Sequence, residues 1–115
     1  RPDLFEGKTH PRKAVGHPNI FFDTLVHDTD SLKLMIDRQG SNQVIMGLDD
    51  PYPLGEMEND AQSSYPGKIL DLAINRDIIN QTQYDQIWED NTLRWLFGDD
   101  EKAKQDLISK MLSKG

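Results

Sequence analysis

The spacing of apolar and polar positions predicts two buried strands with a helix between them. Residues 20–26 are aromatic and β-branched, which is typical of a buried strand, and residues 43–48 supply a second apolar run. Between them, Leu32, Met35 and Ile36 recur at the spacing of one helical face. Because strand–helix–strand units are almost always parallel and right-handed, the pattern predicts a parallel strand pair.

Both ends of this first helix carry residues suited to capping. Asp28, Thr29 or Asp30 can accept a hydrogen bond from a free backbone N–H of the first helical turn. Gly40 suits the left-handed conformation in which many helices end. The helix is therefore expected between these two positions.

The second half of the chain is predicted to be helical. Residues 69–74 form a short apolar stretch, and the pattern Thr82-x-x-Asp85 resembles a capping box at the start of a second helix. A cap at Asp99 or Asp100 would begin a third, amphipathic helix. Its apolar side carries Ala103, Leu107, Ile108, Met111 and Leu112.

Composition narrows the class of protein. The chain has 115 residues, a net charge of −7 and no cysteine. A charge of this sign argues against a nucleic-acid partner, which would require clustered Lys and Arg. Without cysteine, a metal site must use His and carboxylate ligands. No window approaches the roughly 18 apolar residues of a membrane span, so no membrane partner is expected.

The start of the chain is predicted to be irregular. Residues 1–19 hold three of the six prolines and show neither a helical nor a strand period, which indicates a long loop. Because the first residue is Arg1 rather than Met, we expect the chain to be a piece of a longer protein.

The residues best suited to catalysis or metal binding follow the end of the second predicted strand. Asp49 and Asp50 follow the apolar run, and Pro51 and Pro53 then stiffen the chain, because each proline restricts itself and the residue before it. Carboxylates that leave a strand end in a fixed direction suit a metal ligand or a general base. From the pattern alone, a turn or helix-capping aspartate is the more ordinary interpretation of Asp49.

The predicted strand pair needs further strands. A parallel sheet is normally buried on both faces and needs neighbours at both edges, which two strands cannot supply. We therefore predict an α/β fold in which this chain is the C-terminal portion of a (β/α)8 barrel, a fold of about 250 residues, followed by α-helices. Residues 1–58 would be the last two β/α units, and residues 59–115 a C-terminal helical segment of the same domain. Asp49 would then lie at the C-terminal end of a barrel strand, where ligands bind.

Several segments resemble a known family. Residues 22–28 (FDTLVHD), 47–49 (GLD) and 51–56 (PYPLGE) are similar to the C-terminal part of the 2-amino-3-carboxymuconate-6-semialdehyde decarboxylases, which belong to the amidohydrolase superfamily of metal-dependent barrels. The likeness covers residues 1–58 and returns at residues 91–93. The ending Pro-x-Pro-Leu-Gly-Glu is its most specific part.

This resemblance implies a decarboxylase of the kynurenine branch of tryptophan breakdown. Such an enzyme removes CO2 from a small carboxylate by metal-hydroxide chemistry, using Zn²⁺ or another divalent metal and no organic cofactor. Asp49 would be a catalytic residue and a metal ligand, and Tyr52 would line the substrate pocket. The histidine ligands would come from the remainder of the barrel, upstream of this chain. The resemblance also implies a homodimer, and the absence of cysteine fits a cytoplasmic protein.

Asp50 is a departure from the family, in which a tyrosine is typical at this position. A second negative charge there would alter the metal preference or raise the apparent pKa of the carboxylate pair. This leaves open another amidohydrolase-family decarboxylase or hydrolase of a small carboxylic acid. From a different class, the chain could be a non-catalytic helical interaction domain in which Asp49 and Asp50 only form a turn.

The remaining polar candidates are assigned structural roles. His10 and His17 lack the spacing of a zinc motif, and His27 is interpreted as a hydrogen-bonded structural residue. Asp23 is predicted to lie in the middle of a strand, where a buried carboxylate needs hydrogen-bonding partners. The near-helical spacing of Trp88, Trp95 and Phe97 predicts a core or a subunit contact.

Overall fold

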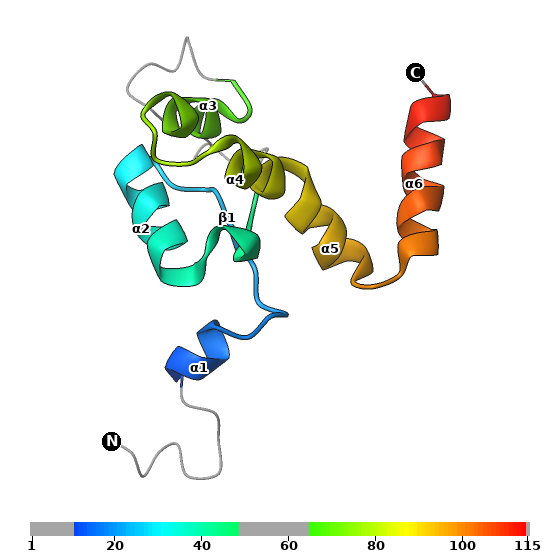
Figure 1. Ribbon diagram of the computed structural model, residues 1–115, viewed down its shortest axis with the longest axis horizontal. Helices are drawn as coiled ribbons and strands as arrows, with labels where there is room; N and C mark the ends of the chain where they lie inside the picture. The colour runs from blue at the N-terminus through cyan, green and yellow to red at the C-terminus, as the bar shows by residue number, and fades with distance from the viewer. Residues whose placement is uncertain (1–10, 49–64, 115) are drawn as a thin grey trace.

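The computed structural model describes residues 11–48 and 65–114, which form a small mixed domain in which helices predominate (Figure 1). The elements follow the chain in the order α1 (Pro11–Val15), β1 (Phe22–Asp23), α2 (Thr29–Gln39), η2 (Ser41–Gln43), β2 (Val44–Ile45), α3 (Lys68–Asn75), α4 (Gln81–Asp85), η3 (Gln86–Asp90), α5 (Asn91–Phe97) and α6 (Glu101–Ser113). Helix η2 is a 3₁₀-helix and η3 is a π-helix.

The two strands pair in parallel, which confirms the predicted arrangement. Phe22 lies opposite Val44, and Asp23 lies opposite Ile45. Each strand has two residues, fewer than the expected runs. On β1 the ladder ends because the Val26 N–H turns back to the Thr24 carbonyl. The sheet described here has these two strands, so the barrel remains a prediction.

Helix α2 connects the strands and has the predicted cap. The Asp28 side chain accepts a hydrogen bond from the Ser31 N–H at 2.7 Å, which satisfies one free donor of the first turn. Gly40 ends the helix, and its φ of 83° is positive as predicted. Its ψ of 145°, however, lies outside the left-handed helical region.

The helices of the second half begin close to the predicted positions, with one correction. The capping box is formed by Asn80 and Gln83, not by Thr82 and Asp85. The Asn80 side chain accepts from the Gln83 N–H at 2.9 Å, and the Gln83 side chain accepts from the Asn80 N–H at 3.0 Å. An asparagine caps as well as threonine, and a glutamine can close the box. Asp100 caps α6, as expected.

The expected irregular start contains a helix in its described part. Residues Pro11–Val15 form α1, with proline in its first turn, where its missing N–H costs no hydrogen bond. The prediction of a loop without elements is therefore wrong at this point. A five-residue helix has too few positions to show an amphipathic period.

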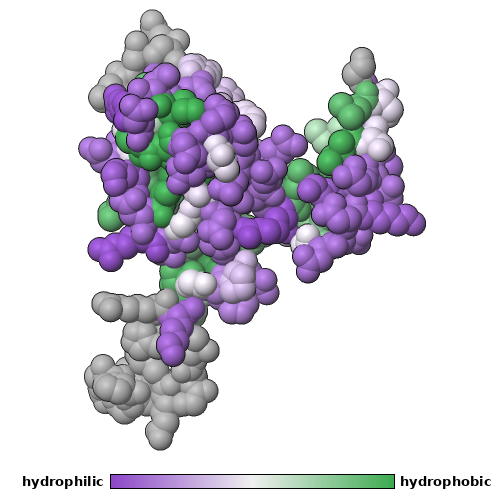
Figure 2. Space-filling view, in the orientation of Figure 1, coloured by the Kyte–Doolittle hydropathy of each residue, from purple (hydrophilic) through white to green (hydrophobic). Residues whose placement is uncertain are grey.

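The core lies between α2, α3 and the strand pair. It contains Leu32, Ile36, Val44, Ile69, Leu70, Ala73, Ile79 and Ile87. Helix α6 lies apart from this core, next to α5 (Figure 1), and none of its residues is buried. Green, apolar surface is visible along this helix in Figure 2. On its apolar side, Leu112 is 77% exposed.

Two aromatic side chains expected to be core or a subunit contact lie on the surface. Trp88 is 42% and Trp95 is 56% exposed, so the core interpretation is wrong for both. Phe97 is half-buried. A contact with another subunit remains a prediction for these residues.

Within the described ranges, no helix is both long enough and apolar enough to cross a membrane.

Candidate functional site

The carboxyl ends of β1 and β2 lie at the same edge of the sheet, because the strands are parallel. Thr24, immediately after β1, is completely buried there. Its hydroxyl accepts a hydrogen bond from the Gly47 N–H at 3.2 Å and lies 3.3 Å from both the Gly47 carbonyl and the Met46 sulfur. The Thr24 side chain, which follows β1, therefore fixes the backbone at Gly47, two residues before Asp49 in the sequence.

Gly47 allows the two strands to approach closely at this edge. A Cβ atom built on Gly47 would lie 2.8 Å from the Asp23 Cβ, which is too close for two carbon atoms. Glycine is required here for space, since every larger residue would push the strands apart.

Asp23 occupies a different environment from the one predicted. It is the last residue of β1 and is exposed, not a buried mid-strand residue, because the strand ends after two residues. Its carboxylate accepts a hydrogen bond from the Leu25 N–H at 3.0 Å. Asp23 therefore shapes the turn after β1, and its charge faces water.

The predicted catalytic and substrate-binding residues, Asp49 and Tyr52, lie outside the described residues, as does Asp50. The structure describes the chain up to Leu48, so it shows the strand end that leads to Asp49 and not the side chain itself. Their roles remain predictions.

The described residues do not assemble a metal centre by themselves. Nowhere in residues 11–48 and 65–114 do three His, Asp or Glu side chains gather closely enough to hold a metal ion. His17 accepts a hydrogen bond from the Asn19 N–H through Nδ1 at 3.2 Å. His27 is exposed beside the cap residue Asp28. A metal site therefore needs donors from outside this part of the chain.

The amino ends of the strands are held by two buried amides, Asn91 and Gln43, for which the sequence pattern predicted no such contacts. Asn91 lies in the segment 91–93 where the family resemblance returns. Asn91 is 4% exposed, and its amide donates to the carbonyls of Ser41 and Val44, both at 2.7 Å. Gln43 is also buried and donates to the carbonyls of His17 and Ile20. The Asn91 amide thus links β2 to α5, and the Gln43 amide links the start of β2 to the segment before β1.

The π-helix η3 makes a backbone hydrogen bond to the residue that follows β2. The Met46 N–H, which follows β2, donates to the Ile87 carbonyl at 2.9 Å. A π-helical turn shifts the internal hydrogen bonds to i→i+5, which can leave a carbonyl available to another element. Strand β2 thus has β1 on one side and a helix backbone as its further hydrogen-bond partner.

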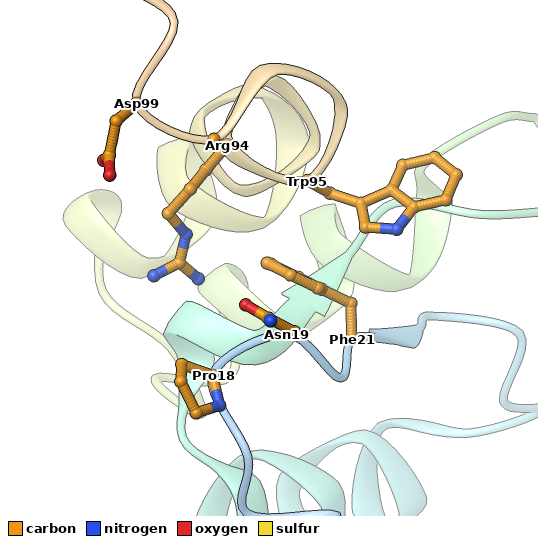
Figure 3. Close-up of a pocket in the computed structure, with 7 residues that line it drawn as sticks. Pro18, Asn19, Phe21, Arg94, Trp95 and Asp99 are labelled. Atoms are coloured by element: carbon orange, nitrogen blue, oxygen red, sulfur yellow. The ribbon is translucent and has the colours of Figure 1, made fainter.

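A hollow of about 400 Å³ lies beside these amino ends (Figure 3). It is lined by Pro18, Asn19, Phe21, Arg94, Trp95, Gly98 and Asp99. The Arg94 guanidinium lies 5.0 Å from the centre of the Phe21 ring, a cation–π distance, and Nη2 donates to Asn42 O and to Gln43 Oε1. The hollow and the Asp49 strand end are therefore at opposite edges of the sheet.

A carboxylate shared by two tyrosines connects α3 to α4. Asp71 accepts hydrogen bonds from the Tyr65 hydroxyl at 2.7 Å and the Tyr84 hydroxyl at 2.8 Å. Burial, followed by the hydrogen bond to Asp71, raises the pKa of Tyr84 above its ordinary value. Tyr84 also stacks on Trp88, with ring centres 6.2 Å apart. These contacts hold Tyr65, which precedes α3, and α4 to the same carboxylate of α3.

Comparison with known proteins confirms the resemblance found in the sequence. The chain is 43% identical over 60 residues to a 2-amino-3-carboxymuconate-6-semialdehyde decarboxylase of Caenorhabditis elegans, a match that covers 50% of the chain and 14% of that protein. It is 34% identical over 73 residues to the protein of the same name from Dictyostelium discoideum, covering 62% of the chain and 18% of the relative. No protein-family model matches the chain.

The matched segments are thus less than a fifth of either relative's length. Such partial matches are consistent with the predicted correspondence to the C-terminal part of these decarboxylases. Both relatives are named as decarboxylases.

Proposed function

We propose that this chain is the C-terminal part of a metal-dependent non-oxidative decarboxylase that acts on a small carboxylate related to 2-amino-3-carboxymuconate-6-semialdehyde. The observation that carries the proposal is the similarity to two decarboxylases of that name. The parallel strand pair supports it, because Asp49 follows the carboxyl end of β2 after Met46, Gly47 and Leu48. In α/β barrels, catalytic residues follow the carboxyl ends of the strands.

In this proposal each residue has one role. Asp49 ligates a divalent metal, Zn²⁺ in the first instance, and Tyr52 lines the pocket that receives the substrate. Histidines from upstream sequence complete the ligand set, and that sequence also completes the (β/α)8 barrel. A metal in such a site lowers the pKa of bound water to about 7. The proposed protein is a cytoplasmic homodimer of the amidohydrolase superfamily.

Thr24 and Gly47 contribute by holding the backbone before Asp49. A metal ligand must keep its geometry within a few tenths of an ångström, which requires support from residues around it. The buried Thr24 hydroxyl and the close contact at Gly47 provide such support two residues before Asp49.

The test compares two neighbouring acids in the full-length protein. Asp49→Ala should abolish both zinc occupancy, measured by elemental analysis, and turnover, followed as loss of the aminocarboxymuconate semialdehyde absorbance. Asp50→Ala is the matched control, because it removes the same charge one residue away and should retain the metal. Wild-type zinc content and rate in Asp49→Ala would contradict the assignment.

The 115-residue chain alone provides a second test. Because its described residues hold no group of metal donors and the proposal takes the histidine ligands from elsewhere, the isolated chain should neither bind zinc tightly nor decarboxylate the substrate. Activity from the isolated chain would show that the catalytic groups all lie within it, and would overturn the proposed division of the ligands.

A further inference from the structure

The hollow beside Arg94 has the features of a ligand site separate from the proposed catalytic edge. Its volume of about 400 Å³ lies within the usual range of small-molecule pockets. It is formed by the segment before β1 and by the end of α5, whereas Asp49 follows the other end of β2. The hollow therefore lies at the amino ends of the strands, opposite to the strand end that precedes Asp49 in the sequence.

One side of the hollow is apolar and flat. Phe21 and Trp95 contribute aromatic rings, and Trp95 is 56% exposed although tryptophan is usually largely buried. Figure 3 shows the Phe21 ring lying between Trp95 and the Arg94 guanidinium. A planar apolar group can stack against such rings, with the gain that aromatic pairs show beyond burial alone.

The other side is polar and carries both signs of charge. Arg94 uses Nη2 for its two hydrogen bonds, and within the described residues Nε and Nη1 make none. Asp99 lies on the same side, and Arg94 and Asp99 form no ion pair with each other in the described part of the chain. A guanidinium with free N–H groups binds a carboxylate, and an aspartate binds an ammonium.

We infer that this hollow binds a free α-amino acid with an aromatic side chain. An α-amino acid carries its carboxylate and its ammonium on one carbon, with the side chain extending from it. This matches a polar end formed by Arg94 and Asp99 and an apolar end formed by Phe21 and Trp95. The inference does not depend on the proposed catalytic function, since it uses neither Asp49 nor a metal.

Opposite charges in one hollow select against simpler ligands. A carboxylate without an ammonium would gain Arg94 but be repelled by Asp99, and an amine without a carboxylate would meet the reverse. The zwitterion satisfies both groups. For a ligand of this size in an open pocket, the expected dissociation constant is on the order of a few mM.

The direct test is a titration of the ¹⁵N-labelled chain with L-phenylalanine, followed by NMR at the two tryptophan indole N–H signals. Trp95 lines the hollow, whereas Trp88 stacks on Tyr84 and serves as an internal control. We expect a saturable shift at Trp95 and none at Trp88. No shift at Trp95, or equal shifts at both, would overturn the inference.

A ligand series tests the role of the two charges. 3-Phenylpropionate lacks the ammonium, and phenethylamine lacks the carboxylate, while both retain the ring. Each should bind more weakly than L-phenylalanine. Equal affinity for all three would show that the hollow recognises only an aromatic ring, which contradicts the proposed class of ligand.

Variants assign the recognition to single side chains. Asp99→Asn leaves the α6 cap at Asp100 intact and should weaken L-phenylalanine binding about threefold, while 3-phenylpropionate binds as before or more tightly. Asp106→Asn, an exposed acid in the middle of α6, is the matched control and should change neither. If both substitutions weaken binding equally, the Asp99 effect comes only from the change in net charge, which would overturn its assigned role.

Arg94→Lys keeps the positive charge but loses the planar fork that binds a carboxylate through two N–H groups. It should weaken L-phenylalanine and 3-phenylpropionate alike and leave phenethylamine unchanged. Loss of phenethylamine binding as well would show that Arg94 acts only by supporting the rings.

Discussion

The carboxyl ends of β1 and β2 form one side of the strand pair, the carboxyl edge, and their amino ends form the other, the amino edge. The two edges are held by different kinds of contact. At the carboxyl edge, one buried hydroxyl of Thr24 and a close glycine contact hold the backbone. At the amino edge, the amides of Asn91 and Gln43 connect segments that are 47 and 26 residues apart in the sequence. The carboxyl edge thus depends mainly on contacts within the strand–helix–strand unit, with the Met46–Ile87 backbone bond as its link to η3. The amino edge depends on polar side-chain contacts between distant parts of the chain.

Because of this difference, substitutions at the two edges should have effects of different extent. A change at the amino edge removes a connection between the two halves of the described chain, so it should affect the stability of the whole domain. A change at the carboxyl edge should mainly displace the backbone before Asp49. The following substitutions test that division.

Asn91→Leu should have the largest effect. Leucine has a similar size, but it leaves the Ser41 and Val44 carbonyls without their amide donor in the interior. The expected loss is about 3 kcal/mol of unfolding free energy, measured by urea denaturation followed by circular dichroism. Asn75→Leu, at an exposed position at the end of α3, is the control and should cost less than about 0.5 kcal/mol. Equal losses would show that the amide contacts are not what stabilises the amino edge.

Gly47→Ala should be the next most costly change. The new Cβ would meet the Asp23 Cβ at 2.8 Å, and such overpacking costs about 1–3 kcal/mol. Because the obstacle is the Cβ of Asp23, Asp23→Gly should remove most of this cost when the two substitutions are combined. The measurement is a double-mutant cycle of unfolding free energies. Additive effects would mean that the strands are not in contact at this point.

These two sites show what the sequence could and could not predict. Apolar periodicity was sufficient for the parallel strand pair, because burial requires alternate or contiguous apolar residues in a strand and a 3.6-residue period in a helix. It also located α2, and residue type limited its cap to Asp28, Thr29 or Asp30, of which the structure has Asp28. By contrast, no local pattern shows that Gln43 and Arg94, 51 residues apart, share a hydrogen bond.

The remaining errors have similar physical causes. A π-helix has no clear signal in a single sequence, so η3 was expected to be ordinary helix. The strand boundaries depended on tertiary contacts, since the Met46 N–H bonds to Ile87 and not to β1. At the carboxyl edge, Thr24 appeared only as one residue of an apolar run, and its hydroxyl gained importance from the close approach of Gly47.

Thr24→Val tests the hydroxyl alone. Valine has nearly the same shape but cannot accept the Gly47 N–H, so we expect a loss of about 1–2 kcal/mol. Hydrogen exchange of the Gly47 amide should become faster. Exchange of amides at the amino edge should change only as far as the lower unfolding free energy of the whole domain requires. Thr82→Val, on the exposed side of α4, is the control. An unchanged Gly47 exchange rate would contradict the role assigned to the hydroxyl.

The smallest effect is expected at Asp28, which lies on the path from the carboxyl edge of β1 into α2. The Ser31 N–H, and after it the Ser31 hydroxyl, lower the pKa of the Asp28 carboxyl below its ordinary value. A carboxyl whose pKa is lower in the folded state stabilises the fold above its unfolded pKa, and this contribution is lost as the pH falls through the folded pKa.

Asp28→Asn keeps the oxygen that accepts the Ser31 N–H and removes the charge, so the wild-type chain should be the more stable at pH 7. The difference should shrink as the pH falls through the lowered folded pKa of Asp28, because wild-type Asp28 then becomes neutral as well. Urea denaturation of both chains at pH 3 and pH 7 measures it, with Asp106→Asn as the control for net charge. A difference that stays constant with pH would show that the cap acts by geometry alone, and that the charge at this edge contributes nothing to α2.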